Sequence, residues 1–345
     1  MIGTPFVMEL AGVVDVLDGL GVPYTAVVND PPWSALAARA PKPARTVAAR
    51  DMDLSHLETL VDAADVGEVV VGIGGGTALD TAKFLAWKTG RPLLQMPTIT
   101  SVDAGFTDAI GVRIDGRVRY IGSIVPIRVV IDVDVIRSAP LRLNRSGIGD
   151  ILSCHTGLWD WKAASDAGHG HRWRDDLAAL GRTLLDELDA HTEDICAVSA
   201  DAVRWMADAY RRIGAACAES RHSRFEEGSE HFWAYAYEHA TGAHHVHGEL
   251  ISFAVVALSS VQGNRPGWAA DVVRRCGTRA NPIDLGITTD EFSSALLGLR
   301  AYARDEGLDV GVADLRGISE SDVADAWAMV NGLPRVESAQ FGHPL

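Results

Sequence analysis

The chain changes its texture near residue 145, and this change constrains the fold more than any single motif does. Before this point, short β-branched runs alternate with stretches whose apolar residues recur at helical spacing. The runs are residues 24–28, 68–73, 92–97 and 129–135. Such alternation predicts βαβ units and a mostly parallel sheet. After this point, long segments with helical spacing dominate, and Pro140, Asn144 and Gly147 mark the boundary.

The length of the chain fits two domains. At 345 residues it is long enough for two hydrophobic cores. We therefore predict an α/β domain at residues 1–145 and an all-helical domain at residues 146–345.

Charge and composition narrow the possible partners. The formal net charge is −15, which opposes binding to nucleic acid or to an anionic bilayer. The longest apolar run, near LISFAVVAL at residues 250–258, is too short to span a membrane. The N-terminal MIGTPFVMEL lacks the basic and apolar regions of an export signal, and the four cysteines are dispersed. We expect a cytoplasmic protein that binds neither nucleic acid nor membranes.

Three consecutive glycines separate a strand-like run from a helical one in the first domain. The stretch GIGGGTALDTAK covers residues 72–83. Glycines at such a junction let backbone N–H groups approach a ligand, and the start of the helix favours an anion. A dinucleotide pyrophosphate is the natural candidate. The GxGxxG spacing is absent, so a tight turn without a ligand stays open as the alternative.

Three short segments of the second half carry residues suited to a divalent cation: GIGD, GSEHFW and HHVHGE. Asp150, His231 and His247 could converge to hold the ion and leave a fourth position open, as a catalytic zinc site requires. A helix cap and ordinary core or surface histidines are the competing interpretation. Further histidines near the third segment also compete as ligands, namely His239, His244 and His245.

Taken in order, the motifs resemble those of one superfamily. They are GGGTALDTAK, PTITSVDAG, APLRLNRSGIGDILSCHTGLWDWKAA, SRFEEGSEH and HGE. In this order and at these separations they are similar to the dehydroquinate synthase-like and iron-containing alcohol dehydrogenase superfamily, and most similar within it to the glycerol-1-phosphate dehydrogenases. The resemblance runs from about Thr4 to the helix after His247.

The resemblance implies a Rossmann-like N-terminal domain that binds NAD(P) and a helical C-terminal domain, with a metal held in the cleft between them. It implies Asp150, His231 and His247 as the metal ligands. We expect zinc, with Fe²⁺ or Ni²⁺ as alternatives. A cation there would make a secondary alcohol more acidic, so that hydride can leave its carbon for the nicotinamide.

The resemblance also implies a set of cofactor-binding residues. Gly74, Gly75 and Gly76 would line the pyrophosphate. Asp80 and Lys83 complete the pattern of the loop and its helix. Thr98 and Ser101 match a cofactor-contacting PTxxS segment. Asp30 corresponds to an acid that faces the adenosine ribose. Because a carboxylate there accepts a 2′-hydroxyl and repels a 2′-phosphate, NAD is favoured over NADP.

Two further residues are candidates for catalysis. Asp103 matches an acid near the nicotinamide and is a possible proton relay, with a loop cap as its alternative. Arg224 is the cation retained in SRFEEGSEH, and we expect it to hold an anionic or strongly polar end of the substrate. Its alternative is a structural ion pair with Glu226 or Glu227. In glycerol-1-phosphate dehydrogenases this segment usually reads SRPASGSEH, so two carboxylates replace small residues beside the predicted pocket.

Three functional interpretations follow. The first is a metal-dependent, NAD(P)-linked dehydrogenase that acts on a small polyol, ketone or sugar phosphate, and that we expect to form a homo-oligomer. The second is a sugar phosphate cyclase of the dehydroquinate synthase type, a lyase that uses NAD transiently. Asp150 as first ligand and the sparse basic residues favour the dehydrogenase. The third is a non-catalytic nucleotide-binding member, which the presence of all three ligands disfavours.

Overall fold

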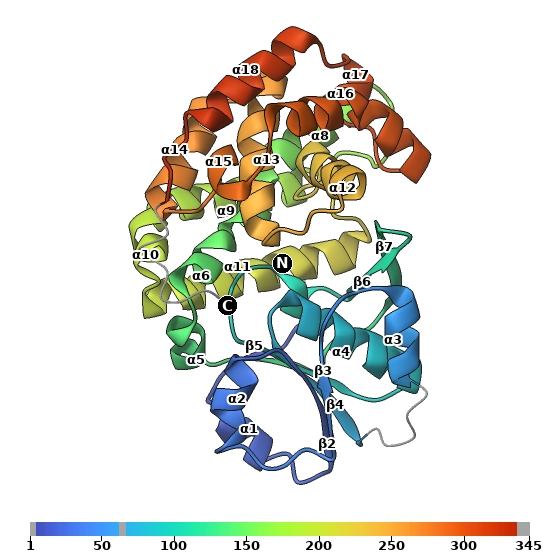
Figure 1. Ribbon diagram of the computed structural model, residues 1–345, viewed down its shortest axis with the longest axis vertical. Coiled ribbons are helices and arrows are strands. Elements are labelled where there is room, and N and C mark those ends of the chain that lie inside the picture. The colour runs from blue at the N-terminus through green and yellow to red at the C-terminus, as the bar shows by residue number, and fades with distance from the viewer. Residues whose placement is uncertain (1–4, 62–66, 337–345) are drawn as a thin grey trace. The chain divides into compact units, whose positions relative to one another are not determined.

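The computed structural model describes residues 5–61 and 67–336. By its contacts the chain divides into two compact units (Figure 1). The first comprises Met1–Ala139 and Ser199–Arg221, and the second comprises Pro140–Val198 and His222–Leu345. The sequence predicts one crossing, near residue 145. It does not anticipate that the chain returns to the first unit for one long helix.

The first unit is built on a parallel sheet with strand order β1-β8-β5-β4-β2-β3. Its strands are β1 (Met8–Leu10), β2 (Tyr24–Val28), β3 (Arg45–Ala48), β4 (Val69–Gly74), β5 (Leu93–Pro97) and β8 (Arg128–Ile131). Every residue of β2 and β5 is buried, as expected of strands covered on both faces. The predicted parallel α/β fold of the N-terminal region is confirmed.

Helices and one hairpin complete the first unit. The helices are α1 (Val13–Asp18), α2 (Pro32–Ala37), α3 (Leu54–Val61), α4 (Gly76–Thr89), η1 (Ala104–Phe106), α5 (Val133–Ser138) and α11 (Ala200–Ser220). The antiparallel hairpin of β6 (Ala109–Ile114) and β7 (Arg117–Ser123) was not predicted. Helix α11 packs against α5 and η1, and the Tyr210 hydroxyl donates to the carbonyl of Thr100 at 2.7 Å.

The strand predicted at residues 129–135 is shorter than expected. It ends at Ile131, and helix α5 begins two residues later. Asp132 accounts for the difference because its carboxylate accepts hydrogen bonds from the backbone N–H of Val135 and of Val13. An aspartate in this position is a strong helix start, which overrides the β-branched run that continues past it.

The strand order places a switch point between β2 and β4. From β2 the chain moves outward to β3, and it then returns to the other side of β2 with β4 and β5. Ligands of open parallel sheets bind at such a point, outside the carboxyl ends of the strands. Asn29 and Asp30 follow β2 there, whereas Gly74 ends β4 and Gly75 and Gly76 follow it.

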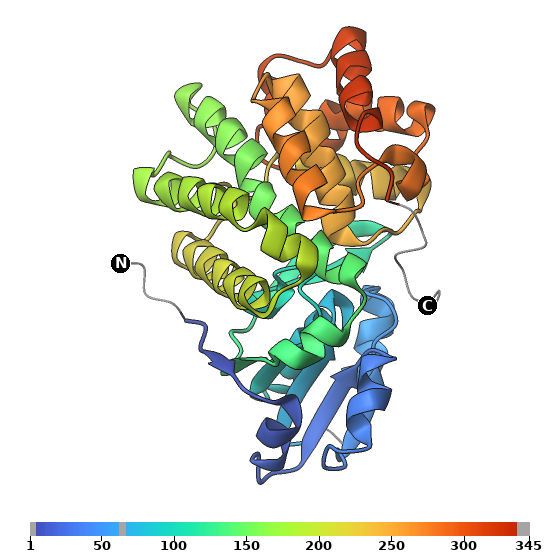
Figure 2. The ribbon, with the colours of Figure 1, turned by 90° about the vertical axis from the view of Figure 1, so that its left-hand side faces the viewer.

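The second unit is helical, as predicted. Its helices are α6 (Leu141–Ser146), α7 (Ile148–Leu152), α8 (Cys154–Asp166), α9 (Asp175–Ala190), α10 (Thr192–Ala197), α12 (Ser229–Thr241), α13 (His247–Gln262), α14 (Pro266–Cys276), α15 (Pro282–Leu285), α16 (Thr289–Glu306), α17 (Val312–Leu315) and α18 (Glu320–Asn331). Helix α13 is buried along almost its whole length and packs against α7, α12, α14 and α18 (Figure 2).

The apolar run at residues 250–258 is therefore a core helix of the second unit. Within the described part of the chain, no helix combines the length and apolarity needed to cross a membrane.

Candidate metal centre and nucleotide loop

The second unit brings Asp150, His231 and His247 together, as the resemblance implies. One ligand atom from each residue lies within 4.8 Å of the other two. His247 Nε2 is 3.3 Å from Asp150 Oδ1. Among the described residues, these three form the group of acidic, histidine or cysteine side chains close enough to share an ion. The neighbouring histidines His239, His244 and His245 are not part of it.

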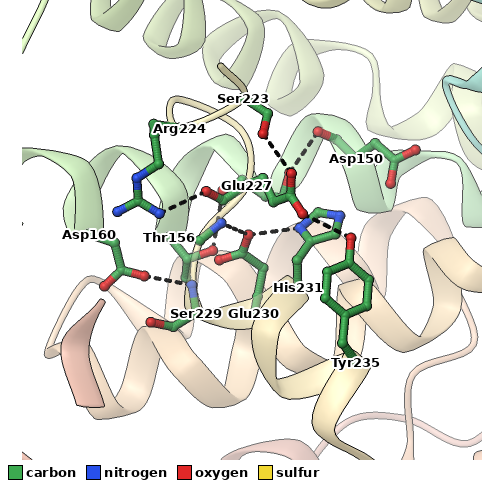
Figure 3. A network of polar contacts seen from close by, with 12 residues as sticks. Asp150, Thr156, Asp160, Ser223, Arg224, Glu227, Ser229, Glu230, His231 and Tyr235 are labelled. Atoms are coloured by element: carbon green, nitrogen blue, oxygen red, sulfur yellow. Dashed lines mark hydrogen bonds and ion pairs between the residues drawn. The ribbon is translucent and has the colours of Figure 1, made fainter. Parts of the chain in front are cut away.

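Close approach of two helices positions two of these residues. Asp150 lies on α7, and His247 is the first residue of α13. A Cβ on Gly149 would lie 2.6 Å from the carbonyl oxygen of Gly248, so only glycine at 149 permits this spacing. His231 stands in the first turn of α12, where the buried Asp160 accepts the N–H of Ser229 at 2.7 Å (Figure 3).

The group is buried on one side and open on the other. Asp150 and His231 are 3% and 6% exposed, whereas the side chain of His247 is 38% exposed. His231 Nδ1 lies 2.9 Å from Glu230 Oε1. Since a carboxylate only accepts, this nitrogen carries the proton, and Nε2 is left for an ion on the side of Asp150 (Figure 3). A carboxylate and two imidazoles are a donor set suited to a divalent cation such as zinc or iron.

The charges around His231 are negative. Burial lowers the pKa of His231, but the hydrogen bond with Glu230 and the charges of Glu227, Glu230 and Asp150 outweigh it and raise the pKa to about 9. An excess of negative charge at a site of this kind favours a cation over a vacant site.

Glu227 lies beside this group and was not predicted to act in it. Its Oε2 accepts from the Ser223 hydroxyl at 2.6 Å, and its Oε1 accepts from the Tyr235 hydroxyl at 2.9 Å (Figure 3). Tyr235 is one turn after His231 on α12, and the two rings are 6.0 Å apart. The Glu227 carboxylate therefore stands over the helix face that carries His231.

Arg224 is buried and is used within the protein. It is 2% exposed. Its guanidinium donates to the carbonyls of Glu227 and Val310, and its Nε lies 3.8 Å from Asp309 Oδ2. These contacts join the segment before α12 to the residues before α17. A grip on substrate would require the guanidinium to give up part of this arrangement, so the geometry favours the supporting role.

A second carboxylate near His247 is also missing from the sequence-based prediction. Glu249 is fully buried and accepts two hydrogen bonds from Arg142, at 2.6 and 2.8 Å. Arg279 approaches the same carboxylate at 3.5 Å. Because Glu249 is two residues after His247 in the first turn of α13, this cluster fixes the start of the helix that carries the ligand. The partners are too far apart in sequence for local patterns to reveal them.

In the first unit, the three glycines form the turn from β4 into α4. Gly74 ends the strand with φ of +155°, and Gly75 is the N-cap of the helix. A Cβ on Gly74 would meet Asn29 Oδ1 at 2.5 Å, and Asn29 Oδ1 accepts the N–H of Gly75 at 3.1 Å. Asn29 thus shapes the turn, a role that was not predicted. The start of α4 at the switch point of the sheet suits an anion such as a pyrophosphate.

The other predicted cofactor residues lie around this turn. Thr98 N donates to the carbonyl of Gly74 at 3.0 Å, and both Thr98 and Ser101 are buried. Lys83 is fully buried, forms a 3.0 Å ion pair with Asp80, and donates to Thr107 Oγ1 and to the carbonyl of Ala109. Lys83 therefore fixes α4 against Thr107 and the first residue of β6.

Asp30 and Asp103 occupy loop positions at the sheet. Asp30 is exposed, and its Oδ1 accepts from the N–H and the hydroxyl of Ser34. Asp103 is the N-cap residue of η1, but its side chain makes no capping hydrogen bond. The loop-cap alternative for Asp103 therefore finds no support in a side-chain cap.

The features of the two units are those of a metal-dependent, nucleotide-binding protein. A parallel α/β unit carries a glycine turn at its switch point, and a helical unit carries an aspartate and two histidines spaced for one cation. Residues 32–140 match the family model described as iron-containing alcohol dehydrogenase. The predicted resemblance to this superfamily is confirmed.

Among characterised proteins, the chain is similar in sequence to glycerol-1-phosphate dehydrogenases. The chain is 27% identical to glycerol-1-phosphate dehydrogenase [NAD(P)+] of Hyperthermus butylicus, over 72% of this chain and 71% of the relative. It is 26% identical to the enzyme of that name from Thermococcus kodakarensis, over 66% and 64%.

Among solved structures, a probable glycerol dehydrogenase from Sinorhizobium meliloti 1021 is similar, with a TM-score of 0.73 and 21% identity. The superposition covers 96% of this chain and 98% of that one. At this level of identity the likeness concerns the fold.

Proposed function

We propose that the protein is a metal-dependent, NAD(P)-linked oxidoreductase that interconverts a secondary alcohol and a ketone on a small polyol or polyol phosphate. The observation that carries the proposal is the convergence of Asp150, His231 and His247 in a chain that also has a glycine turn at the switch point of a parallel sheet. The names of the curated relatives, glycerol-1-phosphate dehydrogenase [NAD(P)+], agree with both parts.

In the proposed reaction, Asp150, His231 and His247 hold a divalent cation, which we take to be zinc. When bound, such a cation acidifies an alcohol and polarises a ketone, which favours hydride exchange with the nicotinamide. Glu230 orients His231 by accepting a hydrogen bond from its Nδ1–H. Asp103 is proposed as a proton relay, because the resemblance matches it to an acid near the nicotinamide.

We further propose that NAD is preferred over NADP. Asp30 follows β2 at the switch point, and Ser34 holds one oxygen of its carboxylate, which fixes the orientation of the group. A carboxylate at the adenosine ribose accepts a hydroxyl and repels a phosphate. In Asp30→Ala, the ratio of catalytic efficiencies with NAD and NADP should fall toward one. A wild-type preference for NADP would contradict this placement of Asp30.

The test of the proposed function combines metal analysis with turnover. Purified wild-type protein should contain about one divalent cation per chain and should reduce NAD with a polyol. His247→Ala should lose the cation and the activity, whereas His244→Ala, at an exposed position outside the group, should keep both. Full metal occupancy in His247→Ala would contradict the ligand set.

The same experiment separates a dehydrogenase from a lyase that uses NAD transiently. A dehydrogenase accumulates NADH in step with the oxidised product. A lyase forms product without net NADH, because the nucleotide is restored within each cycle.

A further inference from the structure

Glu227 places a second negative charge beside the metal centre. Its carboxylate is half-buried and is held by two neutral hydroxyl groups, those of Ser223 and Tyr235. Within the described residues, no lysine, arginine or histidine forms an ion pair with it. Tyr235, which donates to this carboxylate, is one turn after His231 on α12, and the two rings are 6.0 Å apart, so the charge of Glu227 lies close to a metal ligand.

The nearby arginine does not neutralise this carboxylate. Arg224 donates to the backbone carbonyl of Glu227 and not to its side chain. Its charge faces Asp309. Burial raises the pKa of Asp160, and the charge of Arg224 opposes this rise. Two carboxylates thus already share the charge of Arg224.

Glu227 also retains capacity to accept hydrogen bonds. A carboxylate offers about four acceptor positions, and the described contacts use one on each oxygen. A hydroxyl group of a ligand could therefore donate to Glu227 without displacing Ser223 or Tyr235. A phosphate at the same place would bring like charges together, which disfavours its binding.

Building on the proposed function, we propose that Glu227 determines the charge of the substrate: it accepts a hydrogen bond from a hydroxyl of a neutral polyol or hydroxy ketone, and it disfavours a phosphorylated one. The natural substrate is then an uncharged small polyol or its ketone. In this respect the chain differs from its relatives that are named for glycerol 1-phosphate.

The kinetic test compares a matched pair of substrates that differ only in phosphate, glycerol and glycerol 1-phosphate. The wild type should be at least tenfold more efficient with glycerol. Glu227→Gln keeps the shape and removes the charge, and should shift the efficiency ratio toward the phosphate by about tenfold or more. Glu193→Gln removes the same charge at an exposed position on α10 and should leave the ratio unchanged. Tyr235→Phe keeps the carboxylate and should also retain the ratio.

A binding measurement decides the role of Glu227 independently of turnover. Zinc-loaded protein is titrated with inorganic phosphate in a calorimeter. Glu227→Gln should bind phosphate about tenfold more tightly than the wild type and Glu193→Gln, and added salt should narrow the difference. Equal phosphate affinity in all three proteins overturns the proposal. If the wild type oxidises neither substrate with either nucleotide, the proposed function fails, while the titration still decides whether Glu227 excludes phosphate.

Discussion

His231 Nδ1 and Glu230 Oε1 lie 2.9 Å apart, and the same carboxylate oxygen accepts the N–H of Gly228 at 2.6 Å. Glu230 is fully buried. One side chain therefore fixes both the tautomer of a metal ligand and the start of the helix that carries it. Outer partners of this kind orient metal ligands and raise their basicity.

Replacing Glu230 should weaken metal binding while leaving all three ligands in place. In Glu230→Gln the charge is lost but the shape is kept, so the dissociation constant for zinc should rise on the order of 10- to 100-fold. Competition with a chromophoric chelator measures it. Glu238→Gln, farther along α12, is the matched control and should bind zinc as the wild type does. An unchanged constant in Glu230→Gln would show that the hydrogen bond to His231 does not orient the ligand.

The metal centre shows what sequence patterns can and cannot reveal. Asp150, His231 and His247 were identified because each falls in a motif of the resemblance. Spacing alone left His239, His244 and His245 as competitors, since it cannot tell which histidine a fold turns inward. Glu249 and Arg142 were missed because their contact joins helices that only the packing of α13 brings together.

The fold was predictable where local pattern and burial agree. Strand β2 has the predicted bounds because every residue in it is apolar or β-branched and buried. The hairpin β6-β7 was missed because its residues are largely half-buried or exposed, and such strands carry a weak apolar signal. The return of α11 to the first unit was also missed, since helical periodicity shows that a face is buried but not what buries it.

A methyl group at Gly74 should impair nucleotide binding. It would lie 2.5 Å from Asn29 Oδ1, so the turn or Asn29 must move. We expect Gly74→Ala to weaken NADH binding by on the order of tenfold, measured by fluorescence titration. Gly90→Ala is the control, because Gly90 also has positive φ but a Cβ there would have open space around it, with no heavy atom of another part of the chain within 4 Å. Equal NADH affinity in both variants would contradict a role of this turn in binding.

His222 should make the protein less stable in mild acid. Burial lowers the pKa of His222, and the positive charges of His171, Arg224 and Arg174 lower it further. The negative charge of Asp309 raises it in part, and the resulting pKa is about 4. The unfolded chain therefore binds more protons than the native state between about pH 4 and the ordinary value of 6.5. The free energy of unfolding should fall as pH decreases through this window.

The test of this prediction is urea unfolding of His222→Gln at pH 7 and pH 5. Because glutamine does not titrate, the variant should lose less stability than the wild type between the two values. His169→Gln removes an exposed histidine and should behave as the wild type does. An identical loss in all three proteins would show that the acid sensitivity has another origin.

Removal of the Arg224 side chain should lower stability and should impair all substrates alike. The buried guanidinium donates to the carbonyls of Glu227 and Val310, and leaving buried acceptors without partners costs about 1–3 kcal/mol each. The free energy of unfolding of Arg224→Ala should therefore fall by roughly 2–4 kcal/mol. Arg204→Ala, in which an exposed arginine loses only its pairing with Asp201, should change the free energy of unfolding by less than about 1 kcal/mol.

Since the loop from Arg224 to Gly228 leads into the helix that carries His231, we expect Arg224→Ala to lose kcat/KM to a similar extent for glycerol and glycerol 1-phosphate. A selective loss for the phosphorylated substrate, at unchanged unfolding free energy, would instead assign Arg224 to a grip on phosphate.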